Sequence, residues 1–313
     1  MACDGRATAF VAGAAGFIGA ELVKVLVSRG HRVLGLVQSL EEADRVRRAG
    51  AVPIVGDLLE PGRWQDDAAA DWVFHLQAHD LYGPRMTRRR AANISRARVS
   101  MDSHLLDAVT GGGTQRIVYV ADTCWYGPVG PRPVTEDEPP RPSAWGRHFM
   151  PALDRLDGYV AAGLPIVTAL PGWVYGNASW FRERVVEPVI AGRRVLQFGR
   201  TSPWVSPVHV RDCACALVHL AEHGREARRY FVVNTDPIRL DEFARAFARV
   251  AHRPLHVCRV PAFATRLMAG PILADLVGAD AVFANIRLRA SGFSFRYPTL
   301  ESGIQNVLGA LHE

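Results

Sequence analysis

Three glycines near the amino terminus, Gly13, Gly16 and Gly19, restrict the fold of this chain more than any other sequence feature. Residues 8–12, just before them, form an apolar run typical of a buried strand, and residues 17–29 repeat apolar side chains at helical spacing. The turn therefore joins a strand to the amino end of a helix, where free N–H groups and the helix dipole favour a pyrophosphate. Gly13 allows the tight turn, Gly16 the approach of a phosphate, and Gly19 close packing of the helix on the strand. This order of strand, turn and helix predicts a dinucleotide-binding site.

Short apolar runs alternate with helical segments along the first half of the chain. Because such runs are typical of parallel strands buried on both faces, the alternation predicts an α/β fold with a doubly wound, Rossmann-type parallel sheet. A ligand of this fold lies at the carboxyl ends of the strands. Further strands are expected at His31–Val37, Val52–Val55, Trp72–Leu76, Arg116–Ala121 and Pro165–Ala169. Helices are expected at Leu40–Ala49, 93–109 and Trp145–Ala161, with a proline-rich loop at Pro128–Pro142.

Composition indicates an ordinary globular protein. The 313 residues are 49% hydrophobic and 22% charged, which suits a chain with a large core. The amino terminus lacks the basic and apolar regions of a signal peptide, and no apolar run is long enough to span a membrane. We therefore expect a cytoplasmic protein without a membrane partner. The five cysteines lack the paired spacing of zinc ligands and predict neither disulfides nor a metal site.

The chain is basic, with a net charge of +6 and a pI near 9.4, so an acidic partner has to be considered. The densest basic run is 85–98, which holds six arginines. Aromatic side chains are not interleaved with these arginines, as a nucleic-acid stacking platform requires. We therefore expect a solvated helical face there and no nucleic-acid partner.

The end of the second expected strand bears on the choice of dinucleotide. An NAD site usually carries an acidic residue about 20 residues after the glycines, where it binds the ribose hydroxyls. Gln38 and Ser39 occupy that region here, so no carboxylate at this position repels a 2′-phosphate. Both side chains donate hydrogen bonds, and Arg32 or Arg45 would supply positive charge. The sequence therefore favours NADPH over NADH.

Several segments resemble the short-chain dehydrogenase/reductase superfamily, in its extended, epimerase/dehydratase-like branch. They follow in family order through nearly the whole chain: Gly13–Gly19, Gly56–Leu58, Val73–Leu76, Arg116–Val120, Pro171–Gly176, Val208–Asp212, Arg253–Leu255 and Ser302–Ile304. The resemblance implies that 1–172 form mainly the dinucleotide-binding domain. It implies a smaller substrate-binding lobe over 173–313, with a segment of about 205–235 returning to the Rossmann core.

The same resemblance implies a set of cofactor contacts. Asp57 and Leu58 would border the adenine, and Gln77 and Ala78 would follow the pyrophosphate and ribose. Pro171 to Val174 would flank the nicotinamide. Together with the glycine turn and the end of the second strand, the expected cofactor-binding residues are Gly13, Ala15, Gly16, Phe17, Ile18, Gly19, Gln38, Ser39, Asp57, Leu58, Gln77, Ala78, Pro171, Gly172 and Val174.

The resemblance fails at the catalytic residues. Family members use a tyrosine as general acid, a lysine four residues later that lowers its pKa, and a serine or threonine that binds the substrate oxygen. Trp145 and Phe149 stand at the tyrosine and lysine positions, and neither an indole nor a phenyl ring replaces them in a proton relay. The serine position falls at Asp122, followed by Thr123, and these two residues are the catalytic candidates.

Other residues near the expected site are weaker candidates for the proton donor, because each more often has a packing role. They are His79, Tyr82, Tyr126, His148, Tyr175 and His209. The tryptophans gather in segments expected near the site, which indicates either a flat aromatic substrate or, equally, ordinary core packing. Asn93 and Ser95 are polar candidates whose alternative role is to cap the helix that they open. The expected substrate-binding residues are Asn93, Ser95, Trp125, Trp145, Trp173 and Trp204.

These features favour an NADPH-dependent ketoreductase acting on a bulky aromatic ketone. Without the tyrosine and lysine, the proton would come from water or from a phenol of the substrate itself. The chain resembles, in these missing residues, the atypical angucyclinone-reducing ketoreductases of the superfamily, and this resemblance implies an angucyclinone-like polyketide substrate and a role in antibiotic biosynthesis. A redox sensor that binds NADP(H) without turnover is the main alternative, and a nucleotide-sugar epimerase or dehydratase is less favoured because it needs the tyrosine. We expect a monomer or homodimer.

Overall fold

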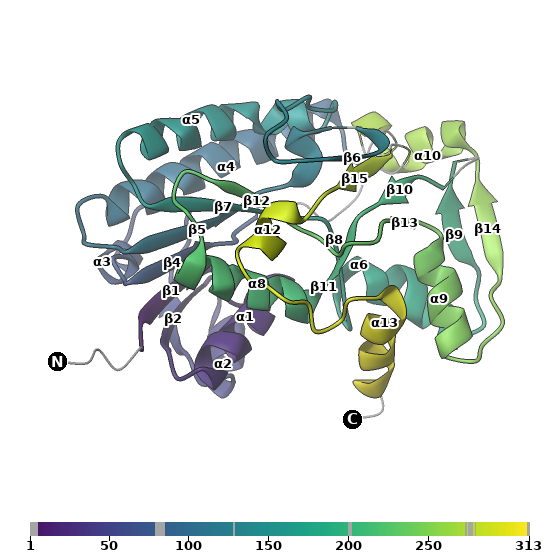
Figure 1. Ribbon diagram of the computed structural model, residues 1–313, viewed down its shortest axis with the longest axis horizontal. Helices are drawn as coiled ribbons and strands as arrows, with labels where there is room; N and C mark the ends of the chain where they lie inside the picture. Colours follow the sequence, from purple (N-terminus) through teal and green to yellow (C-terminus); the bar gives the residue numbers. More distant parts are fainter. Residues whose placement is uncertain are drawn as a thin grey trace.

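The computed structural model of the chain describes residues 6–78, 85–127, 129–199, 202–272, 274, 278 and 280–311. Its centre is a sheet of seven parallel strands in the order β12-β7-β5-β4-β1-β2-β3 (Figure 1). The order reverses between β1 and β4, so a crevice opens at their carboxyl ends. The doubly wound α/β class expected from the sequence is confirmed. The strands are β1 (Thr8–Ala12), β2 (Arg32–Val37), β3 (Val52–Val55), β4 (Trp72–His75), β5 (Arg116–Val120), β7 (Ile166–Pro171) and β12 (Arg229–Val232).

Helices cover both faces of this sheet, as the apolar runs require (Figure 1). Alternate strand residues point to opposite faces, so Phe10 packs toward one layer of helices and Val11 toward the other. One layer consists of α3 (Trp64–Ala68), α4 (Arg88–Val109) and α5 (Met150–Ala161), and the other of α1 (Phe17–Ser28), α2 (Leu40–Arg48) and α8 (Val210–His223). α12 (Ile286–Ala290) packs beside β12.

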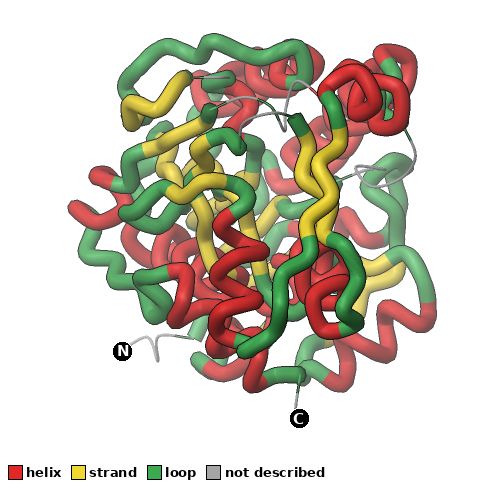
Figure 2. The backbone as a smooth tube through the Cα atoms, turned by 90° about the vertical axis from the view of Figure 1, so that its right-hand side faces the viewer, coloured by secondary structure: helices red, strands yellow, loops and turns green. Residues whose placement is uncertain are grey.

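Smaller sheets and helices extend the molecule beyond the carboxyl ends of the main sheet. A four-stranded sheet has the order β13-β10-β15-β6, and two parallel pairs are β11-β8 and β14-β9, the latter side by side in Figure 2. The strands are β6 (Gly130–Val134), β8 (Trp173–Tyr175), β9 (Val195–Phe198), β10 (Trp204–Val205), β11 (Pro207–His209), β13 (Ile238–Arg239), β14 (Val257–Val260) and β15 (Ala281–Phe283).

Most helices of this region surround a separate core that includes Phe181, Phe243 and Phe247. They are α6 (Ser179–Phe181), a π-helical turn (Arg182–Val186), α7 (Glu187–Ile190), α9 (Glu242–Val250) and α13 (Leu300–Gly309). α10 (Ala262–Ala269) is not part of this core, and its Ala269 carbonyl accepts a hydrogen bond from the Met86 N–H. Two 3-10 turns flank β6 in the sequence: Thr123–Trp125 follows β5, and Gly146–Phe149 precedes α5. The aromatic rings of this core meet edge to face, with Phe181 and Phe243 centroids 5.7 Å apart.

Three expected elements differ from the structure. The helix expected from residue 93 begins at Arg88, because the Thr87 hydroxyl caps it by accepting a hydrogen bond from the Arg90 N–H. The helix expected over 145–161 is divided into a 3-10 turn and α5, which carries Pro151 in its first turn, where no N–H is needed. The proline-rich loop contains β6, which pairs with β15.

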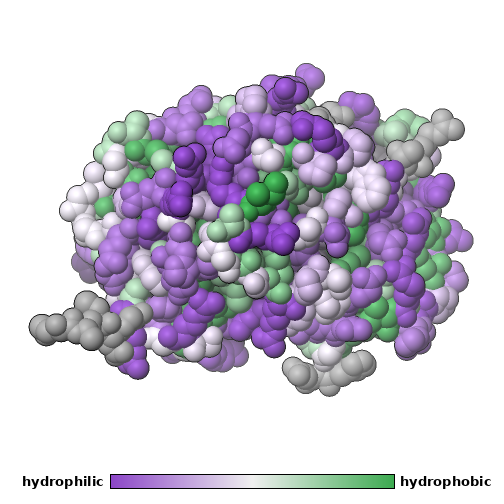
Figure 3. Space-filling view, viewed as in Figure 1, coloured by the Kyte–Doolittle hydropathy of each residue, from purple (hydrophilic) through white to green (hydrophobic). Residues whose placement is uncertain are grey.

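The surface visible in Figure 3 is mainly polar. On the face shown in Figure 3, hydrophilic residues predominate, with small apolar areas between them. Across the described ranges, no helix has both the length and the apolar composition that crossing a bilayer requires.

His209 makes the stability of the fold depend on pH. Its Nδ1 accepts a hydrogen bond from the Arg211 N–H and caps α8, while its ring is buried between Tyr175 and Tyr297. Burial lowers the pKa of His209 from 6.5 to about 4. The unfolded chain therefore binds a proton that the folded chain excludes between these two pH values, so stability falls as pH decreases from 6.5 toward 4.

We expect His209 to contribute about 2–3 kcal/mol to the loss of unfolding free energy between pH 7 and pH 4.5. Urea denaturation at several pH values measures this loss. The His209→Asn variant keeps an oxygen that caps the helix but does not titrate, so its stability should change less over the same range. Equal pH dependence of the two proteins would contradict the assignment.

Candidate functional site

A cavity of about 1030 Å³ runs along the carboxyl ends of the main strands and into the smaller region. This volume is at the upper end for ligand pockets and suits a dinucleotide together with a second molecule. It begins at the crevice between β1 and β4, the position expected for a ligand of this fold. Among the residues expected from the sequence, its lining includes Gly13, Ala15, Gly16, Phe17, Ile18, Gly19, Gln38, Leu58, Gln77, Ala78, Asp122, Thr123, Trp125, Trp145, Phe149, Pro171, Gly172, Trp173 and Val174.

The glycine turn has a shape that side chains would fill. Gly13 has a φ of +87°, which disfavours a residue with a side chain. A Cβ at Gly19 would lie 1.9 Å from the Gly13 carbonyl oxygen, so helix and turn touch at their backbones. Gly16 caps α1 without a side chain, and the first turn of the helix carries no acidic residue. These N–H groups and the positive helix end fit the pyrophosphate of a dinucleotide.

The end of the cavity beside Gln38, where the adenosine of a dinucleotide is expected, differs from the sequence prediction. A carboxylate does reach this end, because Glu42 lines the cavity and its Oε2 accepts a hydrogen bond from the Gln38 N–H at 2.8 Å. Arg45 lies 3.7 Å from the other Glu42 oxygen and partly offsets its charge. Arg32 begins β2 at the end of the strand opposite to the cavity and cannot contribute there. Ser39 does not line the cavity; its hydroxyl caps α2 by accepting from the Glu42 N–H.

Four other expected site residues are not among those that line the cavity, and each has a local role. Asp57 accepts a hydrogen bond from the Leu59 N–H and shapes the turn after β3. Trp204 stacks with the Arg239 guanidinium, 4.4 Å from its ring centre. Asn93 and Ser95 lie inside α4 rather than at its start, where Asn93 accepts from Arg96 and Ser95 donates to the His148 carbonyl.

An apolar wall lines the end of the cavity where the resemblance places the catalytic residues, which is called the reacting end below. Trp145 and Phe149, at the positions where the resemblance places tyrosine and lysine, both line the cavity. Their rings meet edge to face, with centroids 4.7 Å apart and planes at 75°. Trp173 also lines the cavity and meets Trp180 edge to face at 5.3 Å. Neither Trp145 nor Phe149 offers a proton near neutral pH, so the usual relay has no counterpart at these two positions.

Asp122 and Thr123 follow β5 and face the cavity. An Asp122 oxygen accepts a hydrogen bond from the Cys124 N–H at 2.7 Å and caps the 3-10 turn. This bond fixes the carboxyl group at the cavity edge. A carboxylate accepts hydrogen bonds and a hydroxyl both accepts and donates them, so the pair suits binding of a polar group on a substrate.

The other acids considered from the sequence have structural roles. Tyr126 is buried and donates to the Glu136 carbonyl, and Tyr175 is buried against Gly303. Burial raises the pKa of both phenols. His209 caps α8, and neither it nor His148 is among the residues that line the cavity. His79 and Tyr82 lie outside the described residues.

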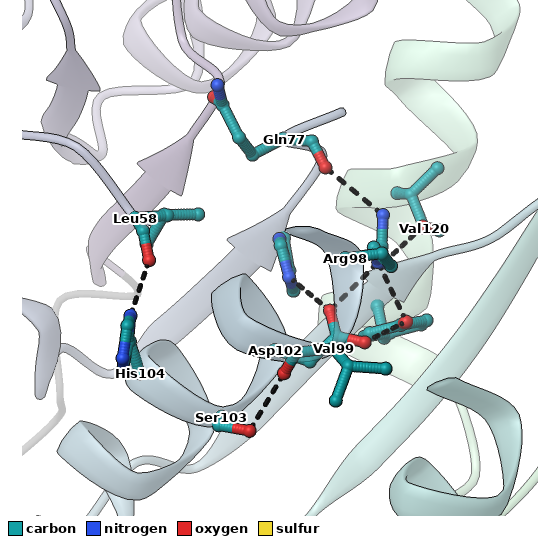
Figure 4. A network of polar contacts seen from close by, with 10 residues as sticks. Leu58, Gln77, Arg98, Val99, Asp102, Ser103, His104 and Val120 are labelled. Atoms are coloured by element: carbon teal, nitrogen blue, oxygen red, sulfur yellow. Dashed lines mark hydrogen bonds and ion pairs between the residues drawn. The ribbon is translucent and has the colours of Figure 1, made fainter. Parts of the chain in front are cut away.

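Figure 4 shows a buried polar network beneath this end of the cavity that sequence analysis missed. Asp102 accepts hydrogen bonds from Tyr119 at 2.8 Å and His75 at 2.7 Å, and its carboxylate pairs with Arg98 at 2.8 Å. Arg98 is therefore buried, not part of the solvated face expected for 85–98. The Arg98 charge lowers the pKa of Asp102, whereas burial lowers the pKa of His75 and keeps its ring neutral. Two sequence signals could have indicated this network: His75 lies within an apolar strand, and Arg98 stands four residues before Asp102.

Comparison with known proteins identifies the family. Residues 9–234 match the NAD dependent epimerase/dehydratase family, and residues 260–307 match a domain of unknown function, DUF1731. A Stigmatella aurantiaca protein named 4-hydroxy-2-methyl-3-oxo-4-farnesyl-3,4-dihydroquinoline-1-oxide ketoreductase is 26% identical over 269 residues, covering 83% of this chain and 78% of that protein. A Streptomyces 3-diazoavenalumate denitrifying reductase is 27% identical over 308 residues, covering 94% and 98%.

A solved structure of human epimerase family protein SDR39U1 with NADPH has the same fold. It superposes with a TM-score of 0.79 at 19% identity, covering 96% of this chain and 99% of that one. The family match spans well over half of the sequence and includes the glycine turn and all seven strands of the main sheet except the first residue of β1. The chain therefore belongs to the NAD-dependent epimerase/dehydratase family, the extended branch of the short-chain dehydrogenase/reductase superfamily.

Proposed function

We propose that this protein is an NADPH-dependent ketoreductase that reduces a ketone of a bulky aromatic, polyketide-type substrate, as in antibiotic biosynthesis. The observation that carries the proposal is a single large cavity that joins the glycine turn to a wall containing Trp125, Trp145 and Trp173. Flat rings stack on or against such side chains. The names of two relatives, a ketoreductase and a reductase, support a reduction rather than an epimerisation.

The chain contributes mainly binding and orientation in this proposal. A bound nicotinamide cofactor would supply a hydride for the carbonyl carbon of the substrate. Gly13, Gly16 and the amino end of α1 would hold its pyrophosphate, and the tryptophans would hold the aromatic substrate. Holding two reactants in reacting geometry lowers the barrier by several kcal/mol without an acid from the protein. The proton that completes the alcohol comes from a phenol of the substrate or from water, since Trp145 and Phe149 cannot deliver it.

NADPH is preferred over NADH in this proposal because Gln38 and Ser39 carry no charge and Arg45 lies on the adjoining helix. Glu42 opposes the preference through its negative charge. We expect the Glu42→Gln variant to bind NADPH about fivefold more tightly relative to NADH, the effect of roughly 1 kcal/mol of repulsion at a partly exposed site. Fluorescence titration with both cofactors measures the ratio. Glu41→Gln, an exposed neighbour that does not line the cavity, is the control and should leave the ratio unchanged.

Paired substrates test the reaction itself. A polycyclic aromatic ketone with a phenol beside the carbonyl should be reduced as NADPH is consumed, and its methyl ether should react much more slowly because it has no proton to give. The Asp122→Ala and Thr123→Ala variants should keep most of the turnover with the phenolic substrate. Loss of turnover in these variants would instead assign the acid to the protein. Tight binding of NADPH without turnover on any ketone of a broad aromatic panel would favour a redox sensor.

A further inference from the structure

Arg98 connects the ends of two neighbouring strands beneath the cavity. From α4, one terminal nitrogen donates to the Gln77 carbonyl at 3.1 Å, and the other donates to the Val120 carbonyl at 3.0 Å (Figure 4). Gln77 follows β4, and Val120 ends β5. One guanidinium therefore fixes the spacing of the two strand ends, because its planar fork has a rigid geometry.

The residues just beyond these carbonyls line the cavity. Gln77 and Ala78 continue from β4, and Asp122 and Thr123 continue from β5. A Cβ at Gly13 would lie 3.1 Å from the Gln77 backbone nitrogen, so the Gln77 segment also touches the glycine turn. A shift of the β4 end would therefore move backbone atoms both at the glycine turn and at the reacting end of the cavity.

Asp102 and Tyr119 hold the Arg98 guanidinium in place. Its Nε lies 2.8 Å from Asp102 Oδ1 and 3.0 Å from the Tyr119 hydroxyl, and its carbon lies 4.4 Å from the Tyr119 ring centre. The Asp102 side chain is 2% exposed and the Arg98 side chain 10%, so water competes little for these contacts. His75 from β4 completes the support through Asp102. Both members of this buried ion pair lie on α4, and their hydrogen bonds to residues of β4 and β5 and to the Gln77 carbonyl connect the helix to the two strands.

Arg98 also reaches the cavity itself. Arg98 lines the same cavity as Phe149, which stands where the resemblance places a lysine. A guanidinium stays protonated at any pH relevant to a protein. A guanidinium paired with the Asp102 carboxylate is therefore present at the carboxyl ends of β4 and β5, although the lysine is missing.

We propose that Arg98 is the positioning residue for the reacting end of the cofactor. It braces the β4 and β5 ends, and so aligns Gln77 and Ala78 with the Asp122 and Thr123 edge. This inference rests on the proposed binding of a nicotinamide cofactor. Arg98 acts through the backbone segments that it holds, and Asp102 and Tyr119 keep its fork in place.

The test compares Arg98→Lys and Arg98→Met with Arg116→Met. Arg116 begins β5, one of the two strands that Arg98 contacts, at the end away from the cavity, and it pairs there with Glu226 at 3.2 Å, so it serves as the control arginine. Lysine keeps the charge of Arg98 but cannot hold two carbonyls and Asp102 in one plane. Cofactor dissociation constants from NADPH fluorescence, thermal unfolding, and amide hydrogen exchange of the peptides around residues 77–78 and 121–123 are measured for each variant.

We expect Arg98→Lys to fold, to bind NADPH about tenfold more weakly, and to exchange faster at both segments, since one or two buried hydrogen bonds are lost. Turnover should fall further than affinity, by about 100-fold, because the reacting atoms are misplaced. Arg116→Met should leave affinity and exchange at these segments unchanged. If folded Arg98→Lys matches the wild type in affinity and local exchange, the proposal is wrong. If the wild-type protein does not bind NADPH, it is the proposed function that fails.

Discussion

Substituting alanine for Gly19 is expected to weaken NADPH binding by about 100-fold or more, which corresponds to roughly 3 kcal/mol. The added Cβ would lie 1.9 Å from the Gly13 carbonyl oxygen and 2.9 Å from the Gly13 carbonyl carbon. Both atoms are backbone, so the contact is relieved only by moving α1 away from the turn. That movement displaces the N–H groups that would hold the pyrophosphate. Fluorescence titration of NADPH measures the loss.

Gly158→Ala provides the control for this substitution. Gly158 lies within α5, and a Cβ there would meet no heavy atom within 4 Å. Alanine is favoured over glycine in a helix by about 0.5–1 kcal/mol, so this variant should be slightly more stable and bind NADPH as the wild type does. Wild-type affinity in Gly19→Ala would show that the glycine turn does not hold the cofactor.

Substituting alanine for Asp102 is expected to lower the free energy of unfolding by about 3–5 kcal/mol. The carboxylate is the buried partner of Arg98 and the acceptor for both His75 and Tyr119. Its removal leaves a positive charge in a site with little water and two donors without this acceptor. Urea denaturation at pH 7 measures the change.

The double variant Arg98→Met/Asp102→Leu separates the charge effect from a general packing effect. Removing both charges of a buried pair costs much less than removing one, because no unpaired charge remains. The double variant should therefore recover a large part of the stability lost in Asp102→Ala. A double variant that is no more stable than the single one would mean that packing, not charge, sets the cost.

The sheet and the glycine turn could be predicted from the sequence because their signals are local. The apolar runs are contiguous, and Gly13, Gly16 and Gly19 are separated by only two residues each. β3 was predicted at its observed bounds, Val52–Val55. β6 was missed because its segment, Gly130–Val134, holds two prolines and pairs with a strand about 150 residues later in the sequence.

The roles of Glu42, Arg98 and Ser95 could not be predicted, because they depend on contacts with residues elsewhere in the chain or on where a helix begins. Glu42 lies beyond the position where an acidic residue is expected, and only the capped start of α2 brings its carboxylate back to Gln38. Arg98 belongs to a run of arginines that is typical of a solvated face, and its burial follows from partners on β5 and from the Gln77 carbonyl just after β4. A helix start that was placed five residues late made Ser95 look like a cap.

Transfer of a labelled hydride tests most directly whether the cavity carries out reduction without a tyrosine and lysine relay. NADPH deuterated at the transferring position of the nicotinamide is mixed with the protein and a phenolic polycyclic ketone. One deuterium per NADPH consumed should appear on the carbinol carbon, and the Trp145→Phe variant should give the same label at a comparable rate. NADPH that binds but passes no deuterium to any ketone in the panel would contradict this account.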